Sequence, residues 1–236
     1  MPVRLGCYVR IILACGLALV LLKSLLPTPG RAQSSDDDFR IYAVNVVKTP
    51  PFKAQFTGYG IYLGKGIVLT AAHVVGHWPM ITHPRVLAAG QDLVADIIKQ
   101  GTFETTDLAL LSVDETKLPV SLRLRRNPLC QGRPQVGMEV VNVIPQSTTR
   151  ARVISPLAIA PELRTRFSTI IDTVENSGSG LFDPQRRCLM GIMSAKMQKY
   201  RRVLVNGHIR LIVDGYAGYF VAADRIANFI PSYLHF

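Results

Sequence analysis

The stretch "TVENSGSGLFD", residues Thr173 to Asp183, holds two serines, Ser177 and Ser179, in a glycine-rich turn just before a hydrophobic run. Glycines and small polar residues are typical of a turn and indicate nothing further by themselves. A serine hydroxyl is a weak nucleophile, and it becomes reactive only beside a base that a third group holds in place. The stretch therefore has catalytic meaning only if the rest of the chain supplies a histidine and a carboxylate.

The candidate base and carboxylate each lie at the end of a predicted strand. His73 follows the apolar run in "VLTAAHVVG", where a lone histidine usually has a structural role. Asp107 comes directly before the apolar run in "TTDLALLSV". Because an unpaired buried charge is costly, Asp107 must be either paired or exposed at the strand end. A solvated aspartate that caps the strand is the alternative to a catalytic one.

The residues from Ile41 onward indicate a β-rich chain. Short runs such as "IYAVNVV", "GIVLTAAHVV" and "GMEVVNVI" are separated by glycine and proline. Only the end, "AADRIANFIPSYL", has a helical pattern, and Pro231 is expected to bend or stop that helix. Many short strands with one terminal helix predict an all-β barrel or sandwich.

Taken together, "TAAH", "DLALL" and "NSGSGLF" resemble the three signatures of the chymotrypsin-like (trypsin-like) serine peptidases. The order histidine, aspartate, serine is that family's order and differs from subtilisins and α/β-hydrolases. The spacings of 34 and 70 residues are similar to those of bacterial trypsin-like and HtrA-type domains. The resemblance covers residues 41–236 and implies two six-stranded antiparallel β-barrels, about 41–125 and about 126–222, with a short C-terminal helix over about 222–234.

The resemblance also implies a role for each matching residue. Ser177 would attack the scissile carbonyl, His73 would take and return the proton, and Asp107 would hold the imidazole. The backbone N–H groups of Ser177 and Glu175 would face the oxyanion. Ser194, in "GIMSA", matches the serine that hydrogen-bonds the catalytic aspartate beside the substrate strand.

Ser177 fits the family pattern better than Ser179, because only Ser177 has asparagine before it and Gly-Ser after it. Glu175, however, stands where the family usually has glycine. If its backbone were forced to positive φ, the strain would cost about 1–2 kcal/mol, and its side chain would crowd the subsite. Alternatively, Glu175 points outward and selects basic substrate residues.

A second departure concerns activation. The segment "DDDFR" before Ile41 resembles an activation site, where cleavage would free a new amino terminus. In trypsin that terminus pairs with an aspartate before the nucleophile, but here Asn176 has no negative charge to complete the pair. We therefore expect no trypsin-like zymogen switch, and we expect residues 33–40 to form a solvated polar linker.

The primary specificity pocket matches five residues of mixed character, which are Ile171, Asp172, Met193, Lys196 and Gly218. A trypsin-like pocket has a carboxylate at its base, where Ile171 stands; Asp172 would serve only if the register slipped by one residue. Met193 disfavours glutamate specificity, which uses a histidine there. His77 and His83 lack ligand spacing, so neither a metal nor a cofactor is expected.

The N-terminus resembles a secretory signal. Arg4 and Arg10 precede the apolar run "IILACGLALVLL", and Gly30 and Ala32 suit a signal-peptidase site, so residues 1–32 would be removed after Ala32. The run of twelve residues spans about 18 Å, short of the hydrocarbon core of about 30 Å. We expect a secreted or periplasmic protein; a membrane anchor over residues 11–26 is the alternative.

The charge of the chain limits which partners it can bind, and its cysteines indicate a disulfide. Removal of residues 1–32 takes away four basic residues and no acid, so the formal net charge falls from +11 to +7. The basic clusters "RLRR" (123–126) and "KMQKYRR" (196–202) match no nucleic-acid-binding motif and are read as a solvated face. Cys130 and Cys188 remain and are expected to form a disulfide, with two buried thiols as the alternative.

These observations predict an exported serine endopeptidase that acts on polypeptides through an acyl-enzyme. A catalytically silent binding protein of the same fold is the main alternative, because Glu175 departs from the oxyanion pattern. A basic module that binds nucleic acid or envelope polyanions would explain the charge but not the triad. No room for a PDZ domain follows the second barrel, so we expect a monomer rather than an HtrA-like oligomer.

Overall fold

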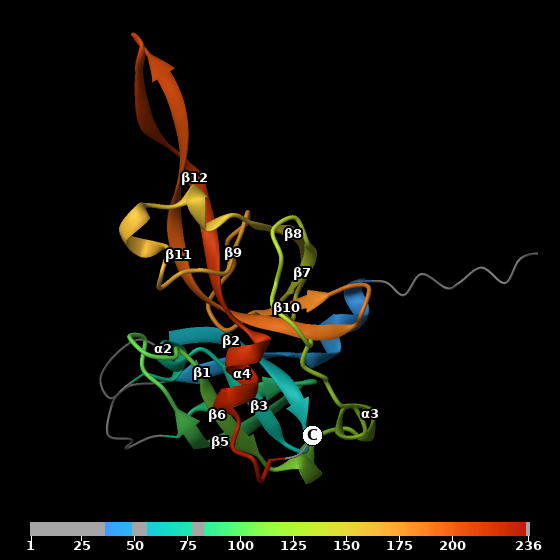
Figure 1. Cartoon of the computed structure of the whole chain (residues 1–236). Coiled ribbons are helices and arrows are strands. Elements are labelled where there is room, and N and C mark those ends of the chain that lie inside the picture. Colours follow the sequence, from blue (N-terminus) through green and yellow to red (C-terminus); the bar gives the residue numbers. More distant parts are fainter. Residues whose placement is uncertain (1–35, 49–55, 77–82, 235–236) are drawn as a thin grey trace, which may run out of the picture. The chain divides into compact units, whose positions relative to one another are not determined.

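The computed structural model describes residues 36–48, 56–76 and 83–234 (Figure 1). The expected signal segment, its cleavage site, the alternative anchor and His77 lie outside the described residues. Among the described residues, no helix combines the length and apolar character needed to cross a bilayer.

The first half of the described chain forms a closed antiparallel barrel of six strands, in the order β1-β2-β3-β6-β5-β4. Its strands are β1 (Ala43–Lys48), β2 (Phe56–Gly64), β3 (Ile67–Thr70), β4 (Arg85–Ala88), β5 (Gln91–Gln100) and β6 (Ala109–Val113). The pairing of β1 with β4 closes the ring. Alternating burial along β4 and β5 places apolar side chains such as Val86 and Leu93 inside the barrel, as the two-residue period of a strand requires.

The second half forms another closed six-stranded barrel, in the order β10-β11-β12-β9-β8-β7. Its strands are β7 (Glu139–Val143), β8 (Thr148–Ile154), β9 (Ile170–Ile171), β10 (Gly180–Asp183), β11 (Cys188–Val205) and β12 (His208–Ala222). The helix α4 (Ala223–Phe229) follows β12 and ends before Pro231. The expected fold class, an all-β chain of two six-stranded barrels with a short C-terminal helix, is confirmed.

Short helical segments connect the strands. They are the α-helical turns α2 (Ala72–Val75) and α3 (Val120–Arg123), and the 3-10 turns η1 (Asp36–Tyr42), η2 (Glu115–Lys117), η3 (Pro156–Ala158) and η4 (Pro161–Leu163). Of these, α2 carries His73 and therefore matters most for the site.

A single apolar cluster joins the two barrels. Ile61 and Leu69 of the first barrel pack in it with Phe182 and Ile192 of the second, and all four are fully buried. The contact is tight, since a Cβ on Gly180 would lie 2.5 Å from the Ile61 side chain. This shared core fixes the seam between the barrels, where the candidate site lies.

The expectation for residues 33–40 was wrong for the part that the structure describes. Residues 36–40 belong to η1, which packs against the second barrel instead of forming a solvated linker. Phe39 is buried and its ring stacks on Phe182 at 4.6 Å between centroids. Arg40 donates to the Pro145 carbonyl at 2.8 Å, and Asp36 pairs with Arg150 at 2.7 Å. Burial of Phe39 offsets the cost of ordering this polar segment.

A disulfide joins Cys130 to Cys188, as expected, with Cα atoms 5.0 Å apart. It ties the segment that follows the first barrel to the start of β11, beside the pairing of Leu129 with Leu189. The 58-residue separation makes the bridge worth about 4 kcal/mol in the chain-entropy account.

The strands β11 and β12 continue well past the other strands of their barrel (Figure 1). We call residues 196–216 the arm. Its strands stay paired from Lys196 opposite Gly218 to Val205 opposite His208. Asn206 and Gly207 make the turn with φ of 51° and 77°, the left-handed values that suit a two-residue hairpin turn. The "KMQKYRR" cluster, read from the sequence as a solvated face, lies on this arm.

Candidate active site

His73 is held beside Asp107 by two hydrogen bonds. It sits in α2, immediately after β3, so the end of the strand and the helical turn fix its backbone. Its backbone N–H donates to Asp107 Oδ1 at 3.0 Å, and its ring Nδ1 lies 2.7 Å from Asp107 Oδ2. A carboxylate at Nδ1 favours the tautomer with the proton on Nδ1, which leaves Nε2 free to accept a proton. The side chain is 37% exposed, so a substrate can approach it.

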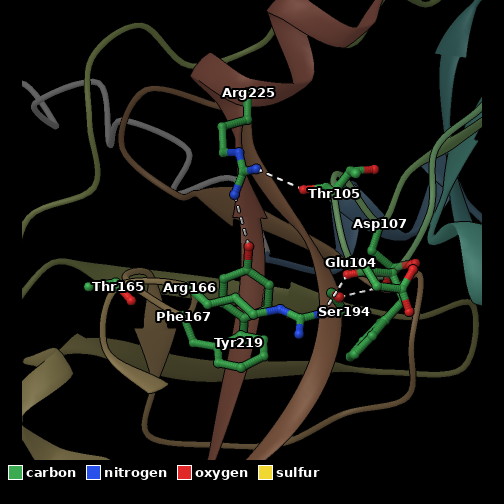
Figure 2. A pocket seen from close by; sticks show the side chains of 10 residues that line it. Glu104, Thr105, Asp107, Thr165, Arg166, Phe167, Ser194, Tyr219 and Arg225 are labelled. Atoms are coloured by element: carbon green, nitrogen blue, oxygen red, sulfur yellow. Dashed lines mark hydrogen bonds between the residues drawn. The ribbon is translucent and has the colours of Figure 1, made fainter. Parts of the chain in front are cut away.

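Asp107 is buried and paired, which excludes the solvated strand cap considered from the sequence. Its side chain is 3% exposed, and it also accepts a hydrogen bond from Ser194 Oγ at 2.5 Å (Figure 2). Burial is the largest single influence on the pKa of Asp107 and raises it. The hydrogen bonds from His73 and Ser194, together with the charge interaction with His73, outweigh burial, so the net pKa is lowered. The group is therefore an ionised carboxylate at neutral pH.

Ser177 lies in the turn between β9 and β10, at the seam of the barrels. Its carbonyl accepts from the Tyr59 N–H of β2 at 3.0 Å, and the next N–H, of Gly178, donates to the Met193 carbonyl of β11 at 2.8 Å. Gly178 has a φ of +86°, and a Cβ there would lie 1.8 Å from the Tyr59 carbonyl oxygen. The glycine is required because the turn is clamped between two strands from different barrels.

The Ser177 hydroxyl donates to the Ser194 carbonyl at 3.4 Å. Ser194 in turn contacts Asp107, and Asp107 contacts His73, so the four residues lie in one hydrogen-bonded chain. Within residues 36–48, 56–76 and 83–234, no hydrogen bond joins Ser177 to His73. The structure thus brings the predicted residues together, with the serine hydroxyl turned toward β11.

Ser179 is fully buried, two residues after Ser177. Its N–H donates to the Asn176 carbonyl at 3.2 Å, and its carbonyl accepts from the Met193 N–H at 2.9 Å. Its hydroxyl has no hydrogen-bond partner in the described part of the chain. A substrate cannot reach Ser179 without displacing this packing.

Glu175 does not adopt the strained backbone that a glycine-like conformation would impose. Among the described residues, positive φ outside glycine occurs only at Lys65, Ala89, Arg187 and Asn206. The strain of about 1–2 kcal/mol considered from the sequence is therefore not present. The half-buried side chain accepts from Thr149 Oγ1 of β8 at 3.4 Å, which turns its carboxylate toward the second barrel.

Three of the five pocket candidates lie together. Ile171 pairs with Gly218 across β9 and β12, and both Ile171 and Met193 are buried. The end of the Met193 side chain covers Gly218, since a Cβ on that glycine would lie 2.7 Å from Met193 Cε. These three residues form a packed apolar wall. Lys196 pairs with Gly218 across β11 and β12, but its side chain contacts the arm, with Nζ 3.6 Å from the ring centroid of Tyr216.

The alternative in which Asp172 replaces Ile171 is wrong. Successive residues of a strand point to opposite faces, so burial of Ile171 places Asp172 outside. Asp172 is exposed and accepts from the Arg152 N–H at 2.7 Å, beside an outer cavity of about 260 Å³ that Glu139 also lines. The surface histidine His83 lies elsewhere, 3.0 Å from Asp96.

Sequence reasoning missed a cavity of about 180 Å³ behind Asp107 and Ser194 (Figure 2). Its other lining residues are Phe103, Glu104, Thr105, Thr165, Arg166, Phe167, Tyr219 and Arg225. Arg166 lies over the Phe103 ring at 4.8 Å and donates to the Phe103 carbonyl at 2.7 Å. The Phe103 ring also meets the His73 ring edge-on at 6.0 Å. The lining residues come from segments far apart in the chain, so no local motif of the sequence indicated the cavity.

No protein-family model and no curated protein matches the chain in sequence. Solved structures do match. The active form of the Rv3671c protease from M. tuberculosis has a TM-score of 0.57 at 18% identity, over 81% of this chain and 80% of that chain. The inactive form of a serine-to-alanine mutant of Rv3671c has a TM-score of 0.52 at 16% identity, over 81% and 87%.

A third similar structure is kallikrein-related peptidase 10 in a complex with Zn²⁺. It has a TM-score of 0.54 at 15% identity, over 80% of this chain and 92% of that chain. At such identities the likeness concerns the fold. With its two closed barrels and its site at their seam, the chain has the fold of the chymotrypsin-like serine proteases.

Proposed function

We propose that this chain is a serine endopeptidase that hydrolyses polypeptides through Ser177, His73 and Asp107. The observation that carries the proposal is the buried carboxylate of Asp107, which accepts from both the ring and the backbone of His73. Burying a charge is costly unless its partners compensate, and here they hold a histidine in the tautomer that general-base catalysis needs. The fold and the glycine-clamped serine turn support the same reaction.

In the proposed reaction, the Ser177 hydroxyl rotates from the Ser194 carbonyl to Nε2 of His73. His73 takes the hydroxyl proton as Ser177 Oγ attacks the scissile carbonyl, and Asp107 stabilises the imidazolium. The carbonyl oxygen, now an oxyanion, faces the N–H groups of Ser177 and Glu175. The C–N bond breaks as His73 gives its proton to the leaving amine, which leaves an ester on Ser177. Water then attacks the ester with His73 as the base, which releases the acyl part as a carboxylic acid and returns the proton to Ser177.

Export is part of the same proposal. The N-terminal signal pattern and the disulfide between Cys130 and Cys188 both suit a chain that folds outside the cytosol. We propose cleavage after Ala32, a monomeric product and no cofactor. N-terminal sequencing of the mature protein from the producing cell tests the cleavage site, and an intact residue 1 would favour the anchor over residues 11–26 instead.

A catalytically silent binding protein is the second candidate. The observation that favours it is the Ser177 hydroxyl, which bonds to the Ser194 carbonyl instead of His73. A hydroxyl in this position is not activated by a base. The two candidates differ in whether Ser177 reaches His73 in solution, and a reagent that needs an activated serine separates them.

Labelling by a fluorophosphonate, read by intact mass, is the test. We expect one adduct on the mature wild-type chain, lost in Ser177→Ala and His73→Ala and kept in Ser179→Ala. The Ser179 variant is the matched control because it removes the neighbouring hydroxyl from the same turn. A folded wild-type protein that takes no label would favour the silent binding protein, and Glu175→Gly would then test whether the oxyanion position is the cause.

A further inference from the structure

The edge of β11 that faces away from β12 begins at the candidate nucleophile. Over Cys188–Ile192 this edge pairs with β10. At Met193 it pairs with the serine turn, through the N–H of Gly178 and the carbonyl of Ser179. At Ser194 its carbonyl accepts from Ser177 Oγ. The next stretch of the edge therefore starts within one residue of the group proposed to attack the substrate.

Beyond Ser194 the same edge is unpaired. Within the described residues, residues 195–205 of β11 pair with β12 alone, and no other strand or loop accepts or donates a backbone hydrogen bond along them. The ten residues from Lys196 to Val205 extend for about 33 Å at about 3.3 Å per residue. An edge of this length presents alternating free N–H and carbonyl groups, which an extended polypeptide can pair with as an added strand.

The positive charge of the arm favours an acidic polypeptide as the added strand. Between Lys196 and Tyr216 the arm carries five Lys or Arg residues and one acid, Asp214. Asp214 is already paired with Arg201 at 3.3 Å. Within the described residues, Lys199 and Arg202 of β11 make no ion pair, and Lys196 lies over the Tyr216 ring, so all three add positive charge beside the free edge. Cross-strand pairs of opposite charge stabilise a sheet and like charges destabilise it, so an acidic segment fits this edge.

Two other occupants are disfavoured by the same charges. A second copy of the arm would place basic residues against basic residues along the edge. The chain's own acidic segment, Asp36 to Asp38, is held on the second barrel by Arg150 and Arg187. A separate acidic polypeptide remains, and the continuity of the edge with Ser177 makes a substrate the fitting one.

The position of His73 indicates which part of the substrate lies on the arm. His73 belongs to the first barrel and must protonate the leaving amine, so the segment after the scissile bond leaves on that side. The acyl part stays on Ser177, which shares the second barrel with β11. The segment before the scissile bond can therefore continue along the arm.

We propose that the free edge of β11 on the arm binds, as an added strand, an acidic segment of the substrate on the N-terminal side of the cleaved bond. This inference rests on the proposed protease function and names its substrate class. The site would extend up to ten residues from the bond, and it would recognise backbone and negative charge together.

The test compares peptides that share one cleaved core, found by screening a peptide library with the mature wild-type chain. One series adds eight residues alternating glutamate and threonine before the core, a second adds lysine and threonine, and a third adds the acidic extension after the core. We expect kcat/KM to rise about tenfold for the first series only, mainly through KM, because edge pairing adds binding energy. N-methylation of alternate amides in the extension should remove the rise.

An arm-shortened enzyme supplies the matched control. Deleting Arg202–Val205 and His208–Leu211 removes four facing pairs and joins Arg201 to Ile212 through the same Asn206–Gly207 turn. We expect wild-type hydrolysis of the core peptide and loss of most of the gain from the acidic extension. Arg202→Glu should reduce the gain more than Arg210→Glu, which makes the same charge change on β12.

The outcomes separate this inference from the function on which it rests. Cleavage of the core with no gain from the acidic extension, or an equal gain in the arm-shortened enzyme, overturns the arm site and leaves the protease intact. A gain only from the extension after the bond overturns it as well. If a folded wild-type chain neither cleaves any peptide nor takes the fluorophosphonate, the protease function fails, and the arm site as a substrate site fails with it.

Discussion

The two halves of the candidate site differ in how firmly they are held. On the first barrel, His73 and Asp107 are joined by hydrogen bonds of 2.7 and 3.0 Å, and the carboxylate is buried. On the second barrel, the backbone of the Ser177 turn is clamped by strands, yet its hydroxyl makes one hydrogen bond of 3.4 Å. The proposed base is thus held in place by hydrogen bonds, whereas the proposed nucleophile is held by its backbone and its side chain must still rotate toward His73.

The largest expected effect comes from breaking the firmer half. Asp107→Asn keeps the size of the side chain but removes the charge and lets an amide face the Nδ1 of His73. We expect kcat to fall about 10⁴-fold, because the imidazole is then held in the wrong tautomer. Steady-state hydrolysis of a cleaved peptide measures this, with the thermal midpoint as a check of folding. A fall of less than tenfold in a folded variant would remove Asp107 from the proposed triad.

The clamped backbone of the other half is tested at Gly178. A Cβ there would lie 1.8 Å from the Tyr59 carbonyl oxygen, at a φ of +86°. We expect Gly178→Ala to lower the free energy of unfolding by about 3 kcal/mol or more, from backbone strain and overpacking together. Urea denaturation of the Ser177→Ala background measures stability without self-digestion.

Gly207 at the tip of the arm is the matched control for Gly178. It has a similar φ of +77°, but a Cβ there would meet nothing within 4 Å. Gly207→Ala should therefore cost only the backbone strain, about 1 kcal/mol. Equal losses at the two glycines would show that the clamp between Tyr59 and Met193 adds nothing to the turn.

Ser194 joins the two halves, since its hydroxyl donates to Asp107 and its carbonyl accepts from Ser177. Ser194→Ala removes the first contact and keeps the second. We expect a loss of about 2 kcal/mol in the free energy of unfolding at neutral pH, because a buried carboxylate loses a charge-assisted donor. A change within 0.5 kcal/mol, about the usual size for surface substitutions, would mean that His73 alone satisfies the carboxylate.

The sequence predicts best those features that are determined by residues close together in the chain. His73, Asp107 and Ser177 each belong to a short motif, and the neighbouring residues of that motif also position the backbone of the residue. The sequence alone therefore predicts that the three lie together. The ordered η1 depends on Phe39 packing against Phe182, far away in the chain, and composition alone suggested a linker. The β11 half of the arm was missed for another reason. Beyond Met197 its side chains are exposed or half-buried, so no alternation of buried and exposed residues marks the length of the strand.

The pH dependence of the free energy of unfolding tests whether Ser194, as well as His73, stabilises the ionised carboxylate of Asp107. The pKa of Asp107 is lowered in the folded state, from an unfolded value of about 3.9, so its pairing stabilises the protein above that pH. The stability is lost as the pH falls through the folded pKa, where Asp107 takes up a proton. In the Ser194→Ala variant the folded-state pKa of Asp107 should be lowered less than in wild type. The loss in free energy of unfolding relative to wild type is therefore largest near neutral pH and shrinks as the pH falls below about 4. Urea denaturation of both proteins in the Ser177→Ala background between about pH 2 and 7 measures the difference. A deficit that stays constant over this range would show that Ser194 acts by packing and that the carboxylate is held by the His73 half alone.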